Sequence, residues 1–243
     1  MSRITRTAAL ALAASCVAAT PATAAPTSDF VAGAELLRQP PGAGWDINLI
    51  IGAKFGTDDG SDITPVRRMQ MSFPGGARFN GDKFKTCASK AKVEGNDCPS
   101  AAKIGSGTAD IILGGQTPIT VDVTVWNGPG TSSRRQVFLE TKLVNVRVAL
   151  AGTMRRTSGA YGYVLDLEVG TILPDLTSGR GVTIKAFQTS IGGSVRVKGK
   201  RIPLVSAPTK CKGGWKFSAT FTYDASSSTV NSQIPCKLTA TTI

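Results

Sequence analysis

The 243-residue sequence contains no histidine. Ser-His-Asp and Cys-His nucleophile pairs and the His-Glu-x-x-His metal motif all require an imidazole, so the chain cannot form them. Most catalytic zinc sites are excluded for the same reason. We therefore expect no metal site and no cofactor.

Long apolar runs are absent beyond the N-terminus. A spanning helix needs about 18 or more apolar residues, so we expect no transmembrane segment. The first residues, "MSRITRTAALALAASCVAATPATAAPTSD", combine Arg3 and Arg6 with an apolar run and a small-residue motif that ends at Ala24. This anatomy predicts a signal peptide over residues 1–24, cleaved after Ala24, and a secreted protein.

Cys16 permits a second interpretation, in which it is lipid-modified and tethers the chain. An alanine, not a leucine, stands three residues before it, and the apolar run ahead of it is short. Cleavage after Ala24 is therefore favoured over lipid anchoring.

Four cysteines remain after the signal peptide, and an even number in an exported chain indicates disulfides. Four cysteines allow three pairings. The sequence favours Cys87–Cys98 with Cys211–Cys236, because each of these pairs brackets one compact segment. We interpret both bridges as structural and not reactive.

Apolar and polar residues alternate along several segments, which is typical of half-buried antiparallel strands. The clearest are 119–125, 161–169 and 215–223. In 161–169 the alternation places Tyr163, Leu165, Leu167 and Val169 on the inward face. Further candidate strands are 46–52, 66–73, 104–113, 135–150, 182–188, 193–198, 200–205 and 233–241.

About ten strands in one chain predict an all-β fold, an antiparallel β-sandwich of jelly-roll type with two local disulfides. Residues 45–243 show no linker and no internal repeat, which indicates a single domain. Residues 25–44 are poor in strand signals. We expect an N-terminal surface or mobile segment there, with at most a helical turn or two over 32–38.

Two stretches resemble a group of secreted, uncharacterised β-rich proteins of actinobacteria. The first is "FPGGARFN" followed by Cys87 and "CPSAAKIGSGTA"; the second is "TKCKGGWKFSATFTYDASSSTVNSQIPC". The likeness covers about residues 65–126 and 205–243. It implies export, β-structure and the same cysteine pairing, and no activity.

Asp166 and Glu168 form the one carboxylate pair that could serve a catalytic role. They lie two residues apart on a strand, so both point to one face, and glycoside hydrolases use such pairs of acids. An outward polar face is the favoured interpretation, because Leu165 and Leu167 make the better core face. Ser89 and Lys92 have the Ser-x-x-Lys spacing of penicillin-recognising enzymes, but the companion motifs are absent.

The sequence carries a formal net charge of +12, and part of this excess lies around one expected hairpin turn. In "SVRVKGKRIPL", Gly199 permits a tight turn, and we expect Val195, Val197 and Ile202 to face the core. The cations at the tip are Arg196, Lys198, Lys200 and Arg201.

These cations suggest an anion-binding site. The favoured function is a secreted non-enzymatic protein that binds an anionic cell-envelope polymer or another secreted protein. The alternative is an extracellular glycan hydrolase that uses Asp166 and Glu168. Nucleic acid is not an expected partner, because aromatic residues do not interleave with the basic ones. The alternative role of the basic tip is to prevent pairing of an exposed strand edge.

Overall fold

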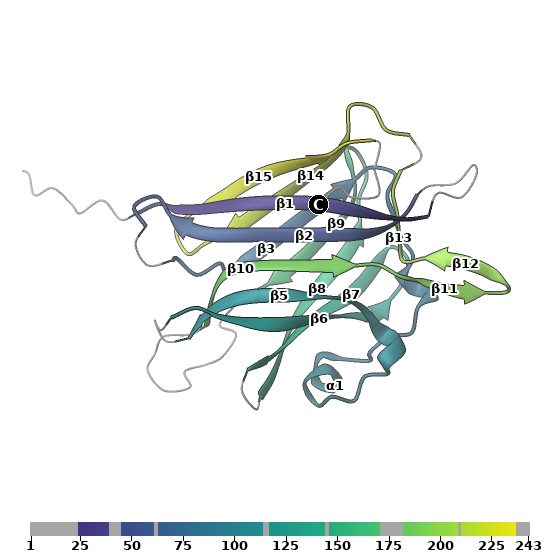
Figure 1. Ribbon diagram of the computed structural model, residues 1–243, viewed down its shortest axis with the longest axis horizontal. Helices are drawn as coiled ribbons and strands as arrows, with labels where there is room; N and C mark the ends of the chain where they lie inside the picture. Colours follow the sequence, from purple (N-terminus) through teal and green to yellow (C-terminus); the bar gives the residue numbers. More distant parts are fainter. Residues whose placement is uncertain are drawn as a thin grey trace, which may run out of the picture.

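A computed structural model of the protein describes residues 24–38, 45–60, 63–113, 117–143, 146–170, 182–208 and 210–236. It is almost entirely antiparallel β-structure, as predicted (Figure 1). The signal peptide predicted over 1–24 lies outside the described residues, except for Ala24. The strands are β1 (Pro26–Arg38), β2 (Asp46–Thr57), β3 (Arg68–Pro74), β4 (Arg78–Phe79), β5 (Lys103–Leu113), β6 (Ile119–Gly130), β7 (Arg134–Leu143), β8 (Val146–Arg156), β9 (Tyr161–Glu168), β10 (Val182–Ile191), β11 (Ser194–Val197), β12 (Lys200–Pro203), β13 (Val205–Ser206), β14 (Trp215–Thr222) and β15 (Ser227–Ile234).

Thirteen strands form one hydrogen-bonded sheet in the order β15-β14-β3-β9-β8-β7-β6-β5-β10-β2-β13-β4, with β1 paired to β2. Strands β5 to β9 follow one another as an up-and-down meander. The connections from β2 to β3 and from β9 to β10 instead cross to distant positions in the sheet. Strands β11 and β12 form a separate two-stranded sheet. The helical elements are α1 (Lys90–Glu94) and two 3-10 turns, Gly81–Lys83 and Ser100–Ala102.

The main sheet folds over on itself, so that two layers face each other across one core. Figure 1 shows β1, β2, β10, β5 and β6 in front of β14, β3, β9 and β8. The layers meet through apolar side chains, including Phe55 of β2 and Phe221 of β14, whose ring centroids are 5.0 Å apart. This is the expected sandwich packing, with the difference that both layers belong to one continuous sheet.

Two glycines of β5 permit the close approach of β5 and β10. A Cβ atom on Gly107 would collide with the carbonyl oxygen of Gln188 and would lie 2.7 Å from Cα of Thr189. Gly105 is similarly close to Ser190, and the register shifts between Lys103 and Gly105. Glycine inside a strand commonly marks such a bulge or close backbone approach. The register shift therefore places a bulge near the start of β5.

The inward faces predicted for two strands are confirmed. Tyr163, Leu165, Leu167 and Val169 are all at most 8% exposed. The alternating aromatic residues of β14 are likewise buried, with Phe221 at 0%. Alternation correctly identified these faces because each strand has one side on the core and one side in solvent.

The interpretation of residues 25–44 is wrong over 26–38. These residues form β1, which pairs antiparallel with β2 along its length, and no part of it is helical. Phe30, Ala32 and Ala34 are buried while Val31 is 64% exposed, so the alternation of a strand is present. Alanine, glycine and leucine supply it in place of β-branched residues, and their low strand propensity concealed the pattern.

Two predicted strand boundaries are also wrong. The segment 135–150 is a hairpin of β7 and β8 and not one strand. The last strand, predicted at 233–241, is β15 over Ser227–Ile234, while residues 237–241 lie outside the described part. Strand β15 was missed because serine, threonine, asparagine and glutamine dominate it, and these residues resemble a loop.

We expect Gly107→Ala to lower the free energy of unfolding by about 1–3 kcal/mol, because the added methyl group forces β5 and β10 apart. The control is the neighbouring Ser106→Ala on the exposed face of β5, which should change it by less than about 0.5 kcal/mol. Urea unfolding monitored by tryptophan fluorescence measures both. Equal stability of the two variants would contradict the role assigned to Gly107.

Candidate anion-binding site

The hairpin of β11 and β12 has the tight turn that the sequence predicted. Val197 and Lys200 pair across it, leaving Lys198 and Gly199 as a two-residue loop. Both loop residues have positive φ, 49° and 78° respectively. Positive φ at both central positions is the signature of the turn whose twist suits a two-residue hairpin.

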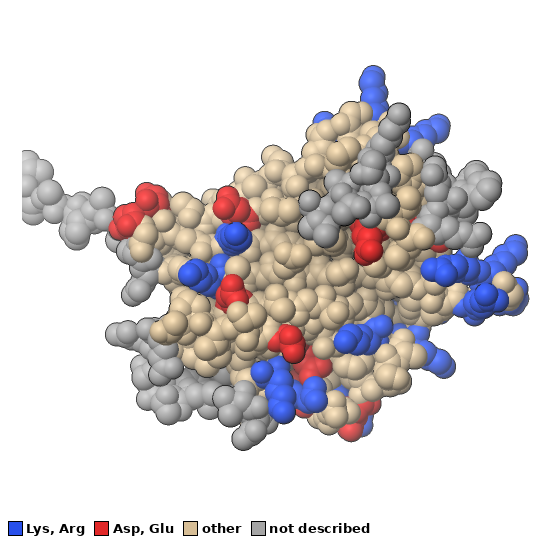
Figure 2. Space-filling model, in the orientation of Figure 1, with Lys and Arg blue, Asp and Glu red and all other residues tan. Residues whose placement is uncertain are grey.

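The four cations of the hairpin are all exposed. Arg196 and Arg201 lie directly opposite each other across the two strands. Among the residues that the structure describes, no carboxylate lies within ion-pair distance of any of the four. Figure 2 shows the resulting blue cluster at the end of the molecule where Figure 1 places β11 and β12.

The hairpin does not pack into the core as expected. Val195, Val197 and Ile202 are only partly buried, and none of them belongs to the core cluster. The anchor is instead Leu204, which follows β12, is fully buried, and donates its backbone N–H to the carbonyl of Gly193. The hairpin therefore projects from the body of the protein, held at its base.

Asp166 and Glu168 lie on β9 with their side chains away from the core. The Arg68 guanidinium group forms two hydrogen bonds with Asp166, with Nε donating to Oδ1 at 2.7 Å and Nη2 to Oδ2. Hydrogen bonding to Arg68 lowers the pKa of Asp166 below its ordinary value. A glycosidase acid needs a raised pKa, so this geometry gives no support to Asp166 as a proton donor.

The Asp166–Arg68 pair should make a pH-dependent contribution to stability. The folded pKa of Asp166 is below the ordinary value of 3.8, so the stabilisation is fully present above that pH and is lost as the pH falls through the folded pKa. Because Arg68 is half exposed, we expect Asp166→Asn to cost at most about 1 kcal/mol at pH 7.

Unfolding free energies of wild type and Asp166→Asn, measured from pH 7 to pH 2, test this. The difference should be constant above about pH 5 and should shrink as the pH falls through the lowered pKa of folded Asp166. The exposed Asp122→Asn is the control and should show a smaller difference throughout. A gap between wild type and Asp166→Asn that does not shrink as the pH falls would contradict the assignment.

Both predicted disulfides are present. Cys87 is bonded to Cys98, with Cα atoms 5.0 Å apart, and Cys211 is bonded to Cys236, with Cα atoms 5.6 Å apart. Cys87 is fully buried. The bonded thiols leave no free nucleophile at these positions, so the structural interpretation of the cysteines is confirmed.

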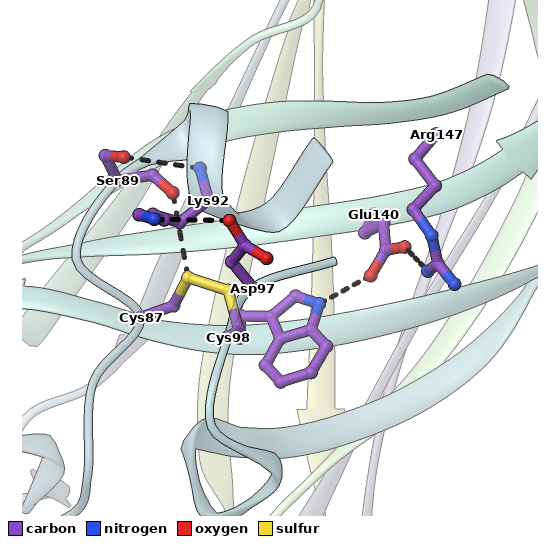
Figure 3. The surroundings of a disulfide bond; sticks show 8 residues. Cys87, Ser89, Lys92, Asp97, Cys98, Glu140 and Arg147 are labelled. Carbon is purple, nitrogen blue, oxygen red and sulfur yellow. Dashed lines mark hydrogen bonds and ion pairs between the residues drawn. A yellow bond between two sulfur atoms is a disulfide. The ribbon is translucent and has the colours of Figure 1, made fainter. Parts of the chain in front are cut away.

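The residues of the Ser-x-x-Lys spacing have structural partners (Figure 3). The Ser89 hydroxyl accepts a hydrogen bond from the backbone N–H of Lys92 at 3.3 Å and thereby caps α1. The Lys92 ammonium lies 3.2 Å from a carboxylate oxygen of Asp97. The two side chains are thus engaged separately, which does not resemble a serine activated by a lysine.

The first disulfide closes a small lobe, residues 87–98, which covers part of the outer face of β7 and β8. Cys87, Val93 of α1, Phe138 and Ala149 form a second apolar cluster, separate from the main core. Ala149 also donates its N–H to the Glu94 carboxylate at 3.2 Å. The lobe is a packed part of the fold and not a solvated loop.

Glu140 of β7 is the buried charge beneath this lobe, and it is only 4% exposed. One carboxylate oxygen accepts a hydrogen bond from Nε1 of Trp126 at 2.7 Å, and the other pairs with Arg147 (Figure 3). The sequence does not reveal this network, because Glu140 occupies an outward position of its strand. Its partners, Trp126 of β6 and Arg147 of β8, become its neighbours only when the strands pair.

We expect Cys87→Ala/Cys98→Ala to lower the free energy of unfolding by roughly 2–4 kcal/mol, because the lobe loses the crosslink that restrains its unfolded state. Urea unfolding with tryptophan fluorescence provides the measurement. Cys211→Ala/Cys236→Ala serves as the comparison and should leave the lobe protected in hydrogen exchange. Unchanged exchange at α1 in the first variant would show that the lobe does not depend on its disulfide.

Three acidic residues, Asp58, Asp59 and Asp62, lie close together in the sequence after β2, and Asp58 accepts a hydrogen bond from the N–H of Ala25 at 3.0 Å. Asp62 lies outside the described residues. Within the described ranges, no group of three histidine, cysteine or carboxylate side chains is arranged to hold a metal ion.

No helix in the described ranges combines the length and apolar character that a membrane crossing requires.

Comparisons with known proteins add no relative: no family model, no curated protein and no solved structure matches the chain.

Proposed function

We propose that the protein is a secreted, non-enzymatic β-sandwich protein that binds an anionic cell-envelope polymer through the β11–β12 hairpin. The observation that carries this proposal is the set of four exposed cations on one projecting hairpin without a carboxylate partner among the described residues. The two disulfides and the signal-peptide pattern support export. The resemblance to secreted actinobacterial proteins supports the same location.

The charges of the hairpin favour a polyanion over a single small anion. Directly opposed residues of an antiparallel pair have Cβ atoms about 5 Å apart, so Arg196 and Arg201 repel each other. Lys198 and Lys200 extend the same field around the turn. A polymer with closely repeated negative groups would neutralise all four cations at once and would release its own counterions.

Protection of a strand edge explains the hairpin less well. Charged residues prevent edge pairing when they lie on the edge of a sheet. Strands β11 and β12 form a separate two-stranded sheet and do not lie on an edge of the main sheet. The charges therefore lie away from the edges that would most need protection.

Neutralising the turn while preserving its backbone tests the proposal. Asparagine tolerates positive φ, so Lys198→Asn/Lys200→Gln removes two charges and keeps the turn. We expect binding to purified anionic wall polymer to weaken roughly 10- to 30-fold at low salt, since each cation near an anionic surface contributes about 1 kcal/mol. Wild-type binding should itself weaken as salt concentration rises.

The matched control is Lys212→Gln/Lys216→Gln, which makes the same change in net charge at exposed positions outside the hairpin. This variant should keep most of the wild-type affinity. If both double variants lose affinity equally, binding depends on net charge alone and the hairpin is not the site. Retention of the wild type that does not respond to salt would also reject the proposal.

A further inference from the structure

The two ends of the curved sheet meet in a parallel orientation. Every pairing from β15 through β14, β3, β9, β8, β7, β6, β5, β10 and β2 to β1 is antiparallel. This path contains eleven strands, so the first and the last run in the same direction. Figure 1 shows that β1 and β15 lie side by side, and they are in contact.

Side-chain hydrogen bonds confirm this orientation. The hydroxyl groups of Ser28 and Ser228 are 2.9 Å apart, and the N–H of Ala32 donates to the hydroxyl of Ser232 at 3.2 Å. Both strands advance by four residues between these contacts, as parallel neighbours must. Among the described residues, β1 and β15 share no backbone ladder. We call this junction the seam.

The seam leaves two strand edges without regular partners. The N–H of Ala32 points toward β15, and backbone groups alternate sides along a strand, so those of Phe30 and Ala34 point there too. The residues that bridge the seam have small side chains on both strands. An open strand edge is a template for pairing with another extended chain.

Two hollows lie next to the seam. One of about 640 Å³ begins at Asp29 and Val31 of β1, extends over β2, β10 and β5, and reaches β15 only at Val230. A second hollow of about 170 Å³ shares Val31 and Gly52 with the first and ends at Gln233 and Ile234. Gly52 has no side chain to fill either hollow, and Val31 is the most exposed large apolar residue among those described.

We propose that the seam is a docking site for one extended peptide segment of a partner protein, which inserts antiparallel to both β1 and β15. A twelfth strand in this position would make every neighbouring pair antiparallel and would supply ladder hydrogen bonds to both edges. This mode of recognition, β-strand addition, takes its affinity from main-chain hydrogen bonds and its specificity from alternate side chains. The proposal is independent of the cationic hairpin.

The side chains around the seam define the peptide. Inward positions should be apolar, because Ala32, Ala34 and Ser232 leave the incoming strand to cover the core. Outward positions carry no strong charge requirement, because Asp29 lies opposite Lys54 and the Glu35 carboxylate accepts a hydrogen bond from Asn48. Proline should be excluded from the segment, since it cannot donate to a ladder.

A disulfide that locks the seam tests the proposal. Ser28→Cys/Ser228→Cys replaces two hydroxyl groups that are already in contact, so the oxidised variant holds β1 against β15. The matched control is Thr220→Cys/Thr229→Cys, whose hydroxyl groups are 3.0 Å apart across the β14–β15 ladder and not across the seam. Thermal unfolding of each oxidised variant establishes that it is folded.

The probe is a displayed library of random eight-residue peptides, selected on the wild-type protein. The recovered peptides should bind the locked variant at least roughly tenfold more weakly than the wild type, because the lock removes the open, binding-competent state. They should bind the control variant as they bind the wild type, and Ser28→Ala/Ser228→Ala more tightly. A proline in the centre of a recovered peptide should abolish binding.

Three outcomes would overturn the proposal. One is recovery of no peptide that binds the wild type, and another is equal binding to the locked and unlocked proteins. The third is a dimer in size-exclusion chromatography that disappears in the locked variant while no peptide binds. In that case β1 exchanges between two copies of this chain, and no partner peptide is required.

Discussion

The backbone ladder that connects β15 to β1 through nine intermediate strands encloses the apolar interior of this protein. Buried backbone groups must be hydrogen-bonded, and a folded-over sheet satisfies them while it covers both sides of one core. The ladder also fixes the relative direction of its first and last strands. Because every pairing is antiparallel and the path has eleven strands, β1 and β15 run in the same direction where they meet. The core, the seam and the position of every outer element follow from this one sheet.

Because the sheet supplies the core, the two elements outside it, the lobe and the β11–β12 hairpin, can differ in burial and in charge. The lobe closed by Cys87 and Cys98 adds a small apolar cluster against β7 and β8. The β11–β12 hairpin adds almost no buried surface and remains exposed. The lobe therefore serves stability, whereas the hairpin makes charge available to solvent at little cost to the core.

The sequence predicted those parts of the fold in which each strand carries its own signal. Strand β14 alternates large aromatic and small polar residues, so its inward face was correct residue by residue. Strands β1 and β15 carry alanine, glycine and serine at the corresponding positions, because they meet at the seam where bulky side chains are not needed. Local propensity could not reveal them, since their burial depends on partners 200 residues away.

In the candidate site, too, local sequence signals predicted some features and could not predict others. The turn at Lys198 and Gly199 was predictable, because a glycine between two alternating segments is a local signal. That Val195 and Val197 lie outside the core was not, since the choice between the main sheet and a separate hairpin depends on the path of the whole chain. Glu140 was equally hidden, because its partner Arg147 becomes its neighbour only through the β7–β8 hairpin.

Lys198, in the turn of the hairpin, has a backbone conformation that is unfavourable for lysine. A residue other than glycine with positive φ carries a conformational cost of about 1–2 kcal/mol, which asparagine or glycine would largely avoid at this position. The turn therefore does not need a lysine, and the three neighbouring cations make a fourth charge less favourable still. Strain of this kind is commonly retained where it serves a function. The turn already holds the four cations close together before an anion arrives. An anion that binds the tip would therefore gain affinity from relieving their repulsion and from the strained conformation that keeps Lys198 in place.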